Sequence, residues 1–223
     1  MSRTAPVAPA PRPKRTAGSR AAEIGSRDRI HDAALELFAE RGYDGVGLQA
    51  IADAAGLHKS SLFHHYRSKL VLAHEVYGRV LEGVLACIEP LAKRREPALE
   101  HLLAAAETLV DHFCDRPQTA RMLLSFSAAP MDSDLRQPVD ADHPEVRFYQ
   151  TVWDWLERAK AAGAVRTDLN VRQAIFNLVG LVIFYPAMAT PDNPLSGPDP
   201  FSSKARRIRK QELRHTLHGM FAP

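Results

Sequence analysis

Apolar residues recur with the spacing of an α-helix along almost the whole chain after residue 26. The first stripe begins at Ile30 and repeats at intervals of three and four residues as far as Phe38, which is the pattern of an amphipathic helix. Ser26 is a candidate N-cap of this helix, and Gly42 is a candidate end. No segment alternates convincingly with the two-residue period of a half-buried strand. We therefore predict an all-α protein.

The segment from Leu48 to Lys69 predicts two short helices joined by a tight turn. Gly56 can adopt the left-handed backbone conformation that ends the first helix, and Ala52 is small enough for the second helix to cross closely over the first. The apolar residues that would form the shared face are Ile51, Ala55, Leu57 and Leu62. The second helix, at about Lys59–Tyr66, keeps a polar outer face, as in a helix-turn-helix unit that enters the major groove of DNA. An ordinary αα-hairpin is the alternative.

A longer helix is expected from Lys69, capped by Ser68, to a point before Pro90. Its buried face would consist of Ala73, Val76, Tyr77, Val80, Leu81, Val84 and Ile88. In the remainder, Pro117 suits the first turn of one helix and Gly163 the end of another. The apolar stripes expected there contain Leu99, Leu102, Leu103, Ala106, Val110 and Phe113, then Met122, Leu123 and Phe126, then Tyr149, Val152, Trp153, Leu156 and Ala159.

Two further helices are expected near the end of the chain. The segment Ala174–Ala189 is almost wholly apolar, so this helix must be buried on all sides, in a core or against another subunit. Asn177 and Pro186 interrupt it, which makes the apolar run too short and too broken to span a bilayer. The final helix, at about 200–220, is basic, and a solvated face is a simpler interpretation of it than a second nucleic-acid site.

The pattern divides the chain into three parts. Residues 1–26, rich in Pro, Ala and Arg, are expected to form a disordered basic arm. Residues 27–72 form the helix-turn-helix domain, and residues 73–223 form a helical effector-binding and dimerisation domain joined to it by the long helix. Residues 1–69 carry 11 Lys and Arg against 7 Asp and Glu, whereas the other 154 residues carry 18 against 19. Positive charge is therefore concentrated where a phosphate-facing surface needs it.

The residue types that catalysis or metal binding requires do not gather in a recognisable motif. Glu212 and His215 form a lone Glu-x-x-His, whereas a di-iron bundle needs two such motifs and further Glu residues. A Gly-rich phosphate loop, a thiolate zinc set and a nucleophile elbow are all missing from the sequence. Cys87 and Cys114 are read as small buried hydrophobes in a reducing cytosol. We expect no catalytic residues, metal, cofactor or membrane partner, and a cytoplasmic protein; a helical-bundle enzyme with an accessory hairpin is the weakest alternative.

The region around the hairpin resembles the tetracycline-repressor (TetR/AcrR) family of transcriptional regulators. The matching residues are Ala33-Ala34-Leu35-Glu36-Leu37-Phe38, Gly42-Tyr43, Ile51-Ala52, Ala55-Gly56, Leu62-Phe63, Tyr66 and Ser68-Lys69. Residues 163–168 and the apolar helix after them also look like the dimerisation region of the family. The resemblance implies a homodimer, formed through helices at about 170–189 and 200–220, on a near-palindromic double-stranded operator. It also implies a pocket for a small-molecule effector in the C-terminal domain.

Three residues depart from the family pattern. Gly47 stands where a Ser or Thr usually caps the second helix and touches a phosphate, and His58 stands where a small hydroxyl or acidic cap is common. Phe63 replaces a frequent Tyr, so a phosphate contact through that hydroxyl is lost. The docking mode is unaffected by these changes, and neighbouring polar residues can compensate in part.

The polar side of the second hairpin helix and its surroundings supply the candidate DNA contacts. These are Gln49, Lys59, Ser60, Ser61, His64, His65 and Lys69. Lys69 is the strongest of them, because an ammonium beside the free amides of a helix start can hold a phosphate. Lys59 can bond a guanine edge, whereas Phe63 and Tyr66 are expected to be mostly core. The basic residues of the arm, which either enter the minor groove or stay solvated, are Arg12, Lys14, Arg15 and Arg20.

An effector pocket needs a few polar groups among apolar walls. The candidate lining residues, each an aromatic or His beside an apolar stripe, are His101, His112, Phe113, Phe126, Tyr149, Trp153 and Phe176. Core packing is the alternative for every one of them. The function that follows is a ligand-responsive transcriptional regulator, with a repressor as the favoured form. The alternative is a non-regulatory, architectural DNA-binding protein whose C-terminal half serves only for assembly.

Overall fold

The computed structural model of the 223-residue chain describes residues 17–130, 133–136 and 138–223, and within 17–24 only the backbone. All regular secondary structure in the described residues is helical, without a strand, which confirms the predicted all-α class. The helices are α1 (Ala17–Arg41), α2 (Leu48–Ala54), α3 (Lys59–His65), α4 (Lys69–Ala92), α5 (Leu99–Asp115), α6 (Pro117–Ser127), α7 (Pro144–Ala161), α8 (Val171–Met188) and α9 (Ser203–Phe221), with one 3-10 turn at Asp134–Arg136.

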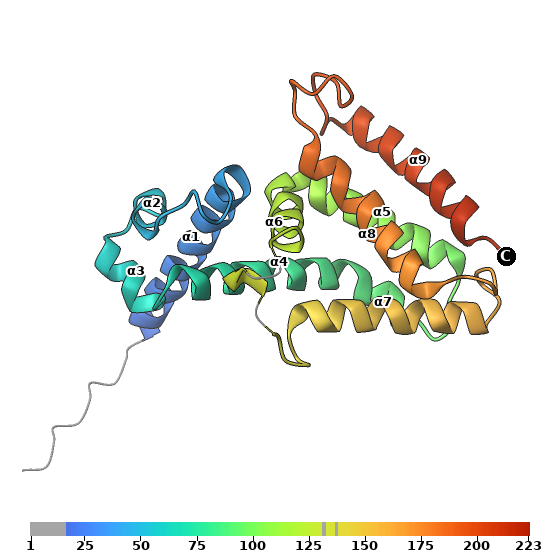
Figure 1. Ribbon diagram of the computed structural model, residues 1–223, viewed down its shortest axis with the longest axis horizontal. Helices are drawn as coiled ribbons and strands as arrows, with labels where there is room; N and C mark the ends of the chain where they lie inside the picture. Colours follow the sequence, from blue (N-terminus) through green and yellow to red (C-terminus); the bar gives the residue numbers. More distant parts are fainter. Residues whose placement is uncertain (1–16, 131–132, 137) are drawn as a thin grey trace, which may run out of the picture.

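Helices α1, α2 and α3 form a small unit at one end of the molecule (Figure 1). Gly42 and Gly56, with φ angles of 71° and 64°, take the left-handed conformation expected at the ends of α1 and α2. The core of the unit is built from the apolar stripe of α1 and the shared face of the hairpin, as the sequence predicted. Its fully buried side chains are Ile30, Ala34, Phe38, Ile51, Ala52, Leu62 and Tyr66.

Helix α4 joins this unit to the rest of the molecule and, at 24 residues, is about 36 Å long (Figure 1). The Ser68 side chain accepts a hydrogen bond from the backbone N–H of Val71, which confirms the predicted N-cap. The whole predicted face from Ala73 to Ile88 is buried. The predicted end before Pro90 is wrong, because the helix continues to Ala92. Pro90 cannot donate a backbone hydrogen bond, but the last turn closes beyond it through the N–H of Lys93, which donates to the Glu89 carbonyl.

The C-terminal part consists of the remainder of α4 and of helices α5 to α9 (Figure 1). Helices α5 and α7 lie against α4, α8 lies against α5, α6 and α7, and α9 lies along α5. Helix α6 also packs against α1, so the N-terminal unit meets the C-terminal part through both α4 and α6. Asn170 caps α8 by accepting from the N–H of Gln173. Gly163, with a φ angle of 66°, follows the end of α7, as predicted.

Two sequence predictions about the N-terminal region need correction. Helix α1 begins at Ala17, inside the segment expected to be an unstructured arm, because Ala and Arg there are good helix formers. Ser26 is consequently an interior residue of α1 and not its N-cap. Arg20 falls in the part of α1 described by its backbone alone, while Arg12, Lys14 and Arg15 lie outside the described residues.

Helix α8 is less buried than its sequence led us to expect. Over Val171–Met188 its mean hydropathy is 1.4, so by length and composition it is able to cross a membrane, contrary to our estimate from Asn177 and Pro186. Core helices of globular proteins meet the same criterion, and α8 packs here against three other helices. One face of α8 nevertheless stays exposed, with Phe176 and Phe184 showing 67% and 61% of their surface. Packing within this chain therefore explains only some of the apolar residues of α8.

Candidate DNA-binding face and effector cavity

Helix α3 turns one side into the N-terminal unit and the other to solvent. Leu62 is fully buried, whereas Lys59, Ser60 and His64 are exposed and Ser61 is half-buried. Phe63 is 46% exposed and lies on the outer side, with the Lys59 ammonium 5.8 Å from the centre of its ring. The expectation that Phe63 is core is therefore wrong, because the packing of Leu62 rotates the next residue outward. Four neighbouring side chains of α3 are therefore exposed to solvent on the same side, namely those of Lys59, Ser60, Phe63 and His64.

His65 points toward α1 and away from the exposed group. Its Nε2 lies 2.9 Å from the Ser26 hydroxyl. Burial lowers the pKa of His65, and the charges of the nearby His64 and Arg27 lower it further, so the ring is neutral at neutral pH. In this structure His65 therefore ties α3 to α1.

Lys69 and Gln49 both have partners within the chain. The Lys69 ammonium donates to the Tyr43 carbonyl at 2.9 Å and lies 4.1 Å from the centre of the Tyr43 ring. The Gln49 amide donates to Asp53 Oδ1 at 2.7 Å. Each group has to share or exchange these contacts in order to bind a phosphate. Gly47 and His58 supply no side-chain cap to α2 and α3, as their sequence positions suggested.

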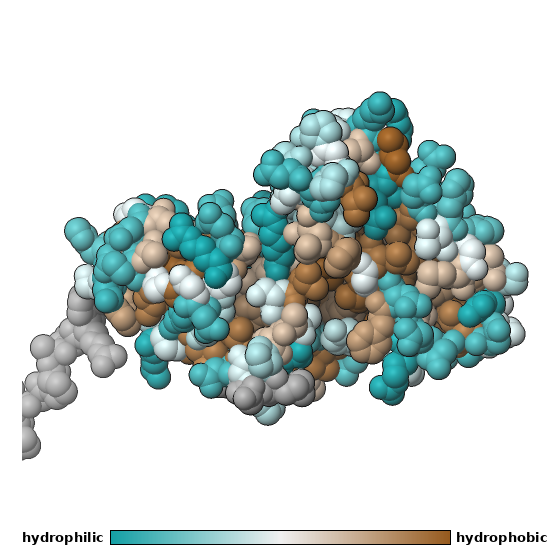
Figure 2. Space-filling view, turned by 45° about the horizontal axis from the view of Figure 1, so that its top comes forward, coloured by the Kyte–Doolittle hydropathy of each residue, from teal (hydrophilic) through white to brown (hydrophobic). Residues whose placement is uncertain are grey.

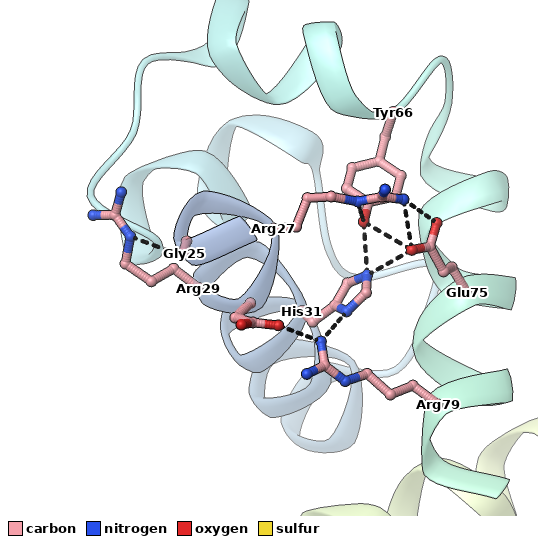
Figure 3. A network of polar contacts seen from close by, with 8 residues as sticks. Gly25, Arg27, Arg29, His31, Tyr66, Glu75 and Arg79 are labelled. Carbon is pink, nitrogen blue, oxygen red and sulfur yellow. Dashed lines mark hydrogen bonds and ion pairs between the residues drawn. The ribbon is translucent and has the colours of Figure 1, made fainter. Parts of the chain in front are cut away.

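A network of polar contacts joins α1, the end of α3 and α4 (Figure 3). His31, on α1, is buried; its Nδ1 lies 2.6 Å from an Arg79 guanidinium nitrogen, and its Nε2 lies 2.7 Å from the Tyr66 hydroxyl. The Tyr66 hydroxyl donates to Glu75 Oε1 at 3.2 Å, and Arg27 pairs with the same carboxylate at 2.8 Å. Helix α3 is thereby connected to α4 through Tyr66, the residue directly after α3.

The hydrogen bonds of the network determine which ring nitrogen of His31 carries the proton. The Arg79 guanidinium can only donate, so Nδ1 has to accept and Nε2 carries the proton that Tyr66 receives. Burial, together with the Arg79 and Arg27 charges and against the opposing effect of Glu75, lowers the pKa of His31. Sequence reasoning missed this network, because its residues on α1 are at least 35 positions along the chain from their partners at the end of α3 and on α4.

A cavity of about 60 Å³ lies inside the C-terminal part. Its walls are apolar side chains from α4, α5, α7 and α8. They are Val84, Ile88, Leu102, Ala105, Ala106, Leu109, Phe113, Phe148, Val152, Trp155, Ile175, Leu178, Val179, Val182 and Ile183. The volume is well below the roughly 300–1,000 Å³ of a typical small-molecule pocket. In this conformation the cavity therefore admits only a small apolar group.

Of the seven residues predicted to line an effector pocket, only Phe113 borders this cavity. Phe126 stacks on Tyr77 with ring centres 4.5 Å apart, and His112 lies over Gly83 of α4, where an added Cβ would be 3.3 Å from its Cε1. His101 lies 3.1 Å from Arg94, while Tyr149, Trp153 and Phe176 are exposed. On α7 the sequence pattern selected Trp153, but Trp155 is the buried tryptophan, with 3% of its surface exposed against 38% for Trp153. Packing against α4 and α8 decides which of the two faces inward.

The outer face of α8 carries exposed apolar residues at intervals of one or two helical turns. Phe176 and Phe184 flank Gly180, where an added Cβ would meet no atom within 4 Å, and Met188 continues the row. Brown apolar atoms are visible at the surface of this C-terminal part in Figure 2. The residues thus form an apolar strip with a gap at Gly180.

Three of the six Lys and Arg residues of α9 form ion pairs with acidic residues of α5. Arg206 pairs with Asp115, Lys210 with Asp111, and Arg214 with Glu100 and Glu107. These ion pairs hold one face of α9 against α5. Among the described residues, no group of three His, Cys, Asp or Glu side chains is arranged to hold a metal ion. Burial raises the pKa of the Cys87 and Cys114 thiols, which is typical of packed cysteines.

Comparison with known proteins identifies the N-terminal unit. Residues 30–76 match the family model described as bacterial regulatory proteins, tetR family. The chain is 29% identical to the transcriptional repressor KstR2 of Mycolicibacterium smegmatis over 154 residues, which cover 65% of this chain and 70% of that protein. It is 30% identical to the transcriptional activator FasR of the same organism over 106 residues, or 48% of each chain.

The whole fold is similar to that of AibR, solved in complex with isovaleryl coenzyme A and operator DNA. The TM-score is 0.68 at 18% identity, over 89% of this chain and 99% of that one. At this identity the similarity concerns the fold alone. The family match and these relatives identify residues 30–76 as the DNA-binding unit of the tetR family of bacterial regulatory proteins, and they make the chain a DNA-binding transcriptional regulator rather than an enzyme.

Proposed function

We propose that the chain is a homodimeric, ligand-responsive transcriptional repressor that binds a near-palindromic operator through α3. The observation that carries the proposal is that α4 borders the apolar cavity with Val84 and Ile88 and holds the DNA-binding unit with Glu75 and Arg79. One rigid helix is therefore in contact with both sites.

Docking on DNA would use the outward face of α3. Lys59, Ser60 and His64 are exposed side by side, and Ser61 is within reach of the same face. Lys59 can donate to a guanine edge, and the two serines can reach a base or a phosphate. Lys69 and Gln49 would bind DNA phosphates by giving up their present hydrogen bonds to Tyr43 and Asp53. His65, which already pairs with Ser26, is the weakest of the seven candidates.

The second subunit would cover the outer face of α8. Phe176 and Phe184 are too exposed to be explained by packing within one chain, and the gap at Gly180 allows two copies of α8 to approach closely. A two-fold dimer would bring two α3 helices to successive major grooves, which is why the operator should be near-palindromic. Phe184→Glu should convert the dimer to a monomer in sedimentation velocity. Val71→Glu, at an exposed residue in the first turn of α4, is the matched control and should remain dimeric.

The effector would place an apolar group in the cavity. AibR was solved with isovaleryl coenzyme A, a small branched acyl chain on a large polar carrier. The walls here offer side chains of the same chemistry as such a chain, but the volume of about 60 Å³ is small. A larger apolar group has to push the walls apart, and Val84 and Ile88 belong to α4. Binding would thereby move the helix that holds the DNA-binding unit.

The chain offers a direct assay for this binding. Its two tryptophans are Trp153, on the surface, and Trp155, in the cavity wall. In Trp153→Phe the remaining fluorescence comes from Trp155. Titration with isovaleryl-CoA and with longer acyl-CoA molecules should shift this fluorescence and weaken operator binding by about 5- to 150-fold. Ala106→Leu, which fills the cavity from α5, should abolish the response while DNA binding is retained.

The alternative is an architectural DNA-binding protein without an effector. It predicts that no acyl-CoA changes the Trp155 signal or the operator affinity. The sign of regulation is tested separately, because KstR2 is a repressor and FasR an activator. A promoter fused to a reporter should be silenced by the protein if it is a repressor and stimulated if it is an activator.

A further inference from the structure

Phe63 is an apolar side chain on a surface that is otherwise polar. It is 46% exposed, whereas Leu62 beside it is fully buried. Its neighbours on the outer side of α3 are Lys59, Ser60 and His64, the residues assigned above to DNA. An aromatic ring of this exposure leaves apolar surface in water, and that surface is removed from water only when α3 docks.

The ring is held in place from one side. The Lys59 ammonium lies 5.8 Å from the ring centre, within the range of a cation–π contact. Lys59 and Phe63 are four residues apart, so they occupy the same face of α3, one turn apart. The two side chains therefore enter the groove as a pair of a charged donor and an apolar ring.

The major groove offers one apolar group among the base edges of unmodified DNA. Guanine, cytosine and adenine present only hydrogen-bond donors and acceptors there, whereas thymine adds its C5 methyl group. We propose that Phe63 is a specificity-determining residue that recognises a thymine methyl group in each half-site of the operator. The proposal rests on the docking of α3 in the major groove put forward above.

The position of Lys59 relative to Phe63 also predicts the spacing of the two bases that these side chains would contact. Four residues of helix correspond to about 6 Å along the axis, and successive base pairs are about 3.4 Å apart. A lysine in the major groove prefers the O6 and N7 of guanine. With α3 lying along the groove, a guanine read by Lys59 should therefore lie about two base pairs from the thymine read by Phe63.

The experiment removes the methyl group from the DNA and the ring from the protein. The full chain first selects its operator from a pool of random duplexes. Each thymine of the selected site is then replaced by deoxyuridine, symmetrically in both half-sites, and affinity is measured by fluorescence anisotropy at fixed salt. At one position wild type should lose about fourfold per half-site, the effect of burying one methyl group. Phe63→Ala should bind the thymine duplex more weakly and no longer distinguish it from the deoxyuridine duplex.

Two further variants separate base recognition from a structural role. Phe63→Leu retains an apolar side chain and should keep part of the discrimination, and Phe63→Tyr should keep most of it. Circular dichroism verifies that all variants fold, as expected for a residue on the surface. If wild type and Phe63→Ala respond equally to every deoxyuridine, or wild type responds to none, the proposal is wrong. If wild type selects no duplex at all, the proposed function itself fails.

Discussion

Removing the hydroxyl of Tyr66 tests the polar network between the DNA-binding unit and α4. Tyr66 is 1% exposed, and its hydroxyl lies 2.7 Å from His31 Nε2. In Tyr66→Phe the Nε2–H loses this acceptor inside the protein, and an unsatisfied buried donor costs about 1–3 kcal/mol. Glu75 Oε1 lies 3.3 Å from the same nitrogen and can accept in its place. We therefore expect a loss near the lower end, about 1–2 kcal/mol of unfolding free energy.

The measurement is urea unfolding followed by circular dichroism at one fixed protein concentration, because dimerisation makes stability depend on concentration. Tyr149→Phe, at an exposed tyrosine, is the matched control and should change the unfolding free energy by less than about 0.5 kcal/mol. Adding Glu75→Ala to Tyr66→Phe removes both acceptors, so the double variant should lose more than the two single losses together. Equal stability of Tyr66→Phe and Tyr149→Phe, or strict additivity in the double variant, would contradict the role given to this network.

Three other predictions concern single interactions. The folded-state pKa of His31 is lowered, so the unfolded chain binds this proton first as the pH falls. The stability that His31 contributes above pH 6.5 is therefore lost as the pH falls from 6.5 through the folded-state pKa. Wild type should lose more unfolding free energy between pH 7.5 and 5.5 than His31→Asn, and identical losses would refute this. Ser68→Ala removes the cap of α4 and should cost about 1 kcal/mol in the same assay, where a change near zero would mean that the cap is replaced by solvent. Arg214→Ala breaks exposed ion pairs with Glu100 and Glu107 and should cost less than about 1 kcal/mol, decreasing with added salt; a larger, salt-independent loss would show that packing of the arginine stem matters more than its charge.

The helices were predictable where their signals are local. Gly42 and Gly56 end α1 and α2 with positive φ angles, and Ser68 caps α4, because each of these residues needs only a few neighbouring residues to act. The buried face of α4 followed in the same way from its apolar period. The start of α1 was misjudged because a high content of Pro, Ala and Arg was taken as disorder over its whole length.

The cavity and the network depend on packing between distant segments, which one sequence does not reveal. Trp153 and Trp155 are two residues apart on α7, and only contact with α4 and α8 determines that Trp155 is the one inside. His31, Tyr66 and Arg79 come from three elements and give no common motif. Phe63 was assigned to the core because it is apolar, although the rotation of α3 set by Leu62 turns it outward.

The central claim is that α3 recognises a specific operator, and binding to DNA from upstream of the protein's own gene tests it most directly. Affinity is measured at physiological salt for wild type and for the double variant Lys59→Ala/His64→Ala, against a duplex of unrelated sequence as control. The account predicts that wild type binds its site at least about 1,000-fold more tightly than the control duplex, and that the variant loses most of this preference. Weak, salt-sensitive binding that is equal for both proteins and both duplexes would show that charge alone holds the DNA, and would contradict recognition by α3.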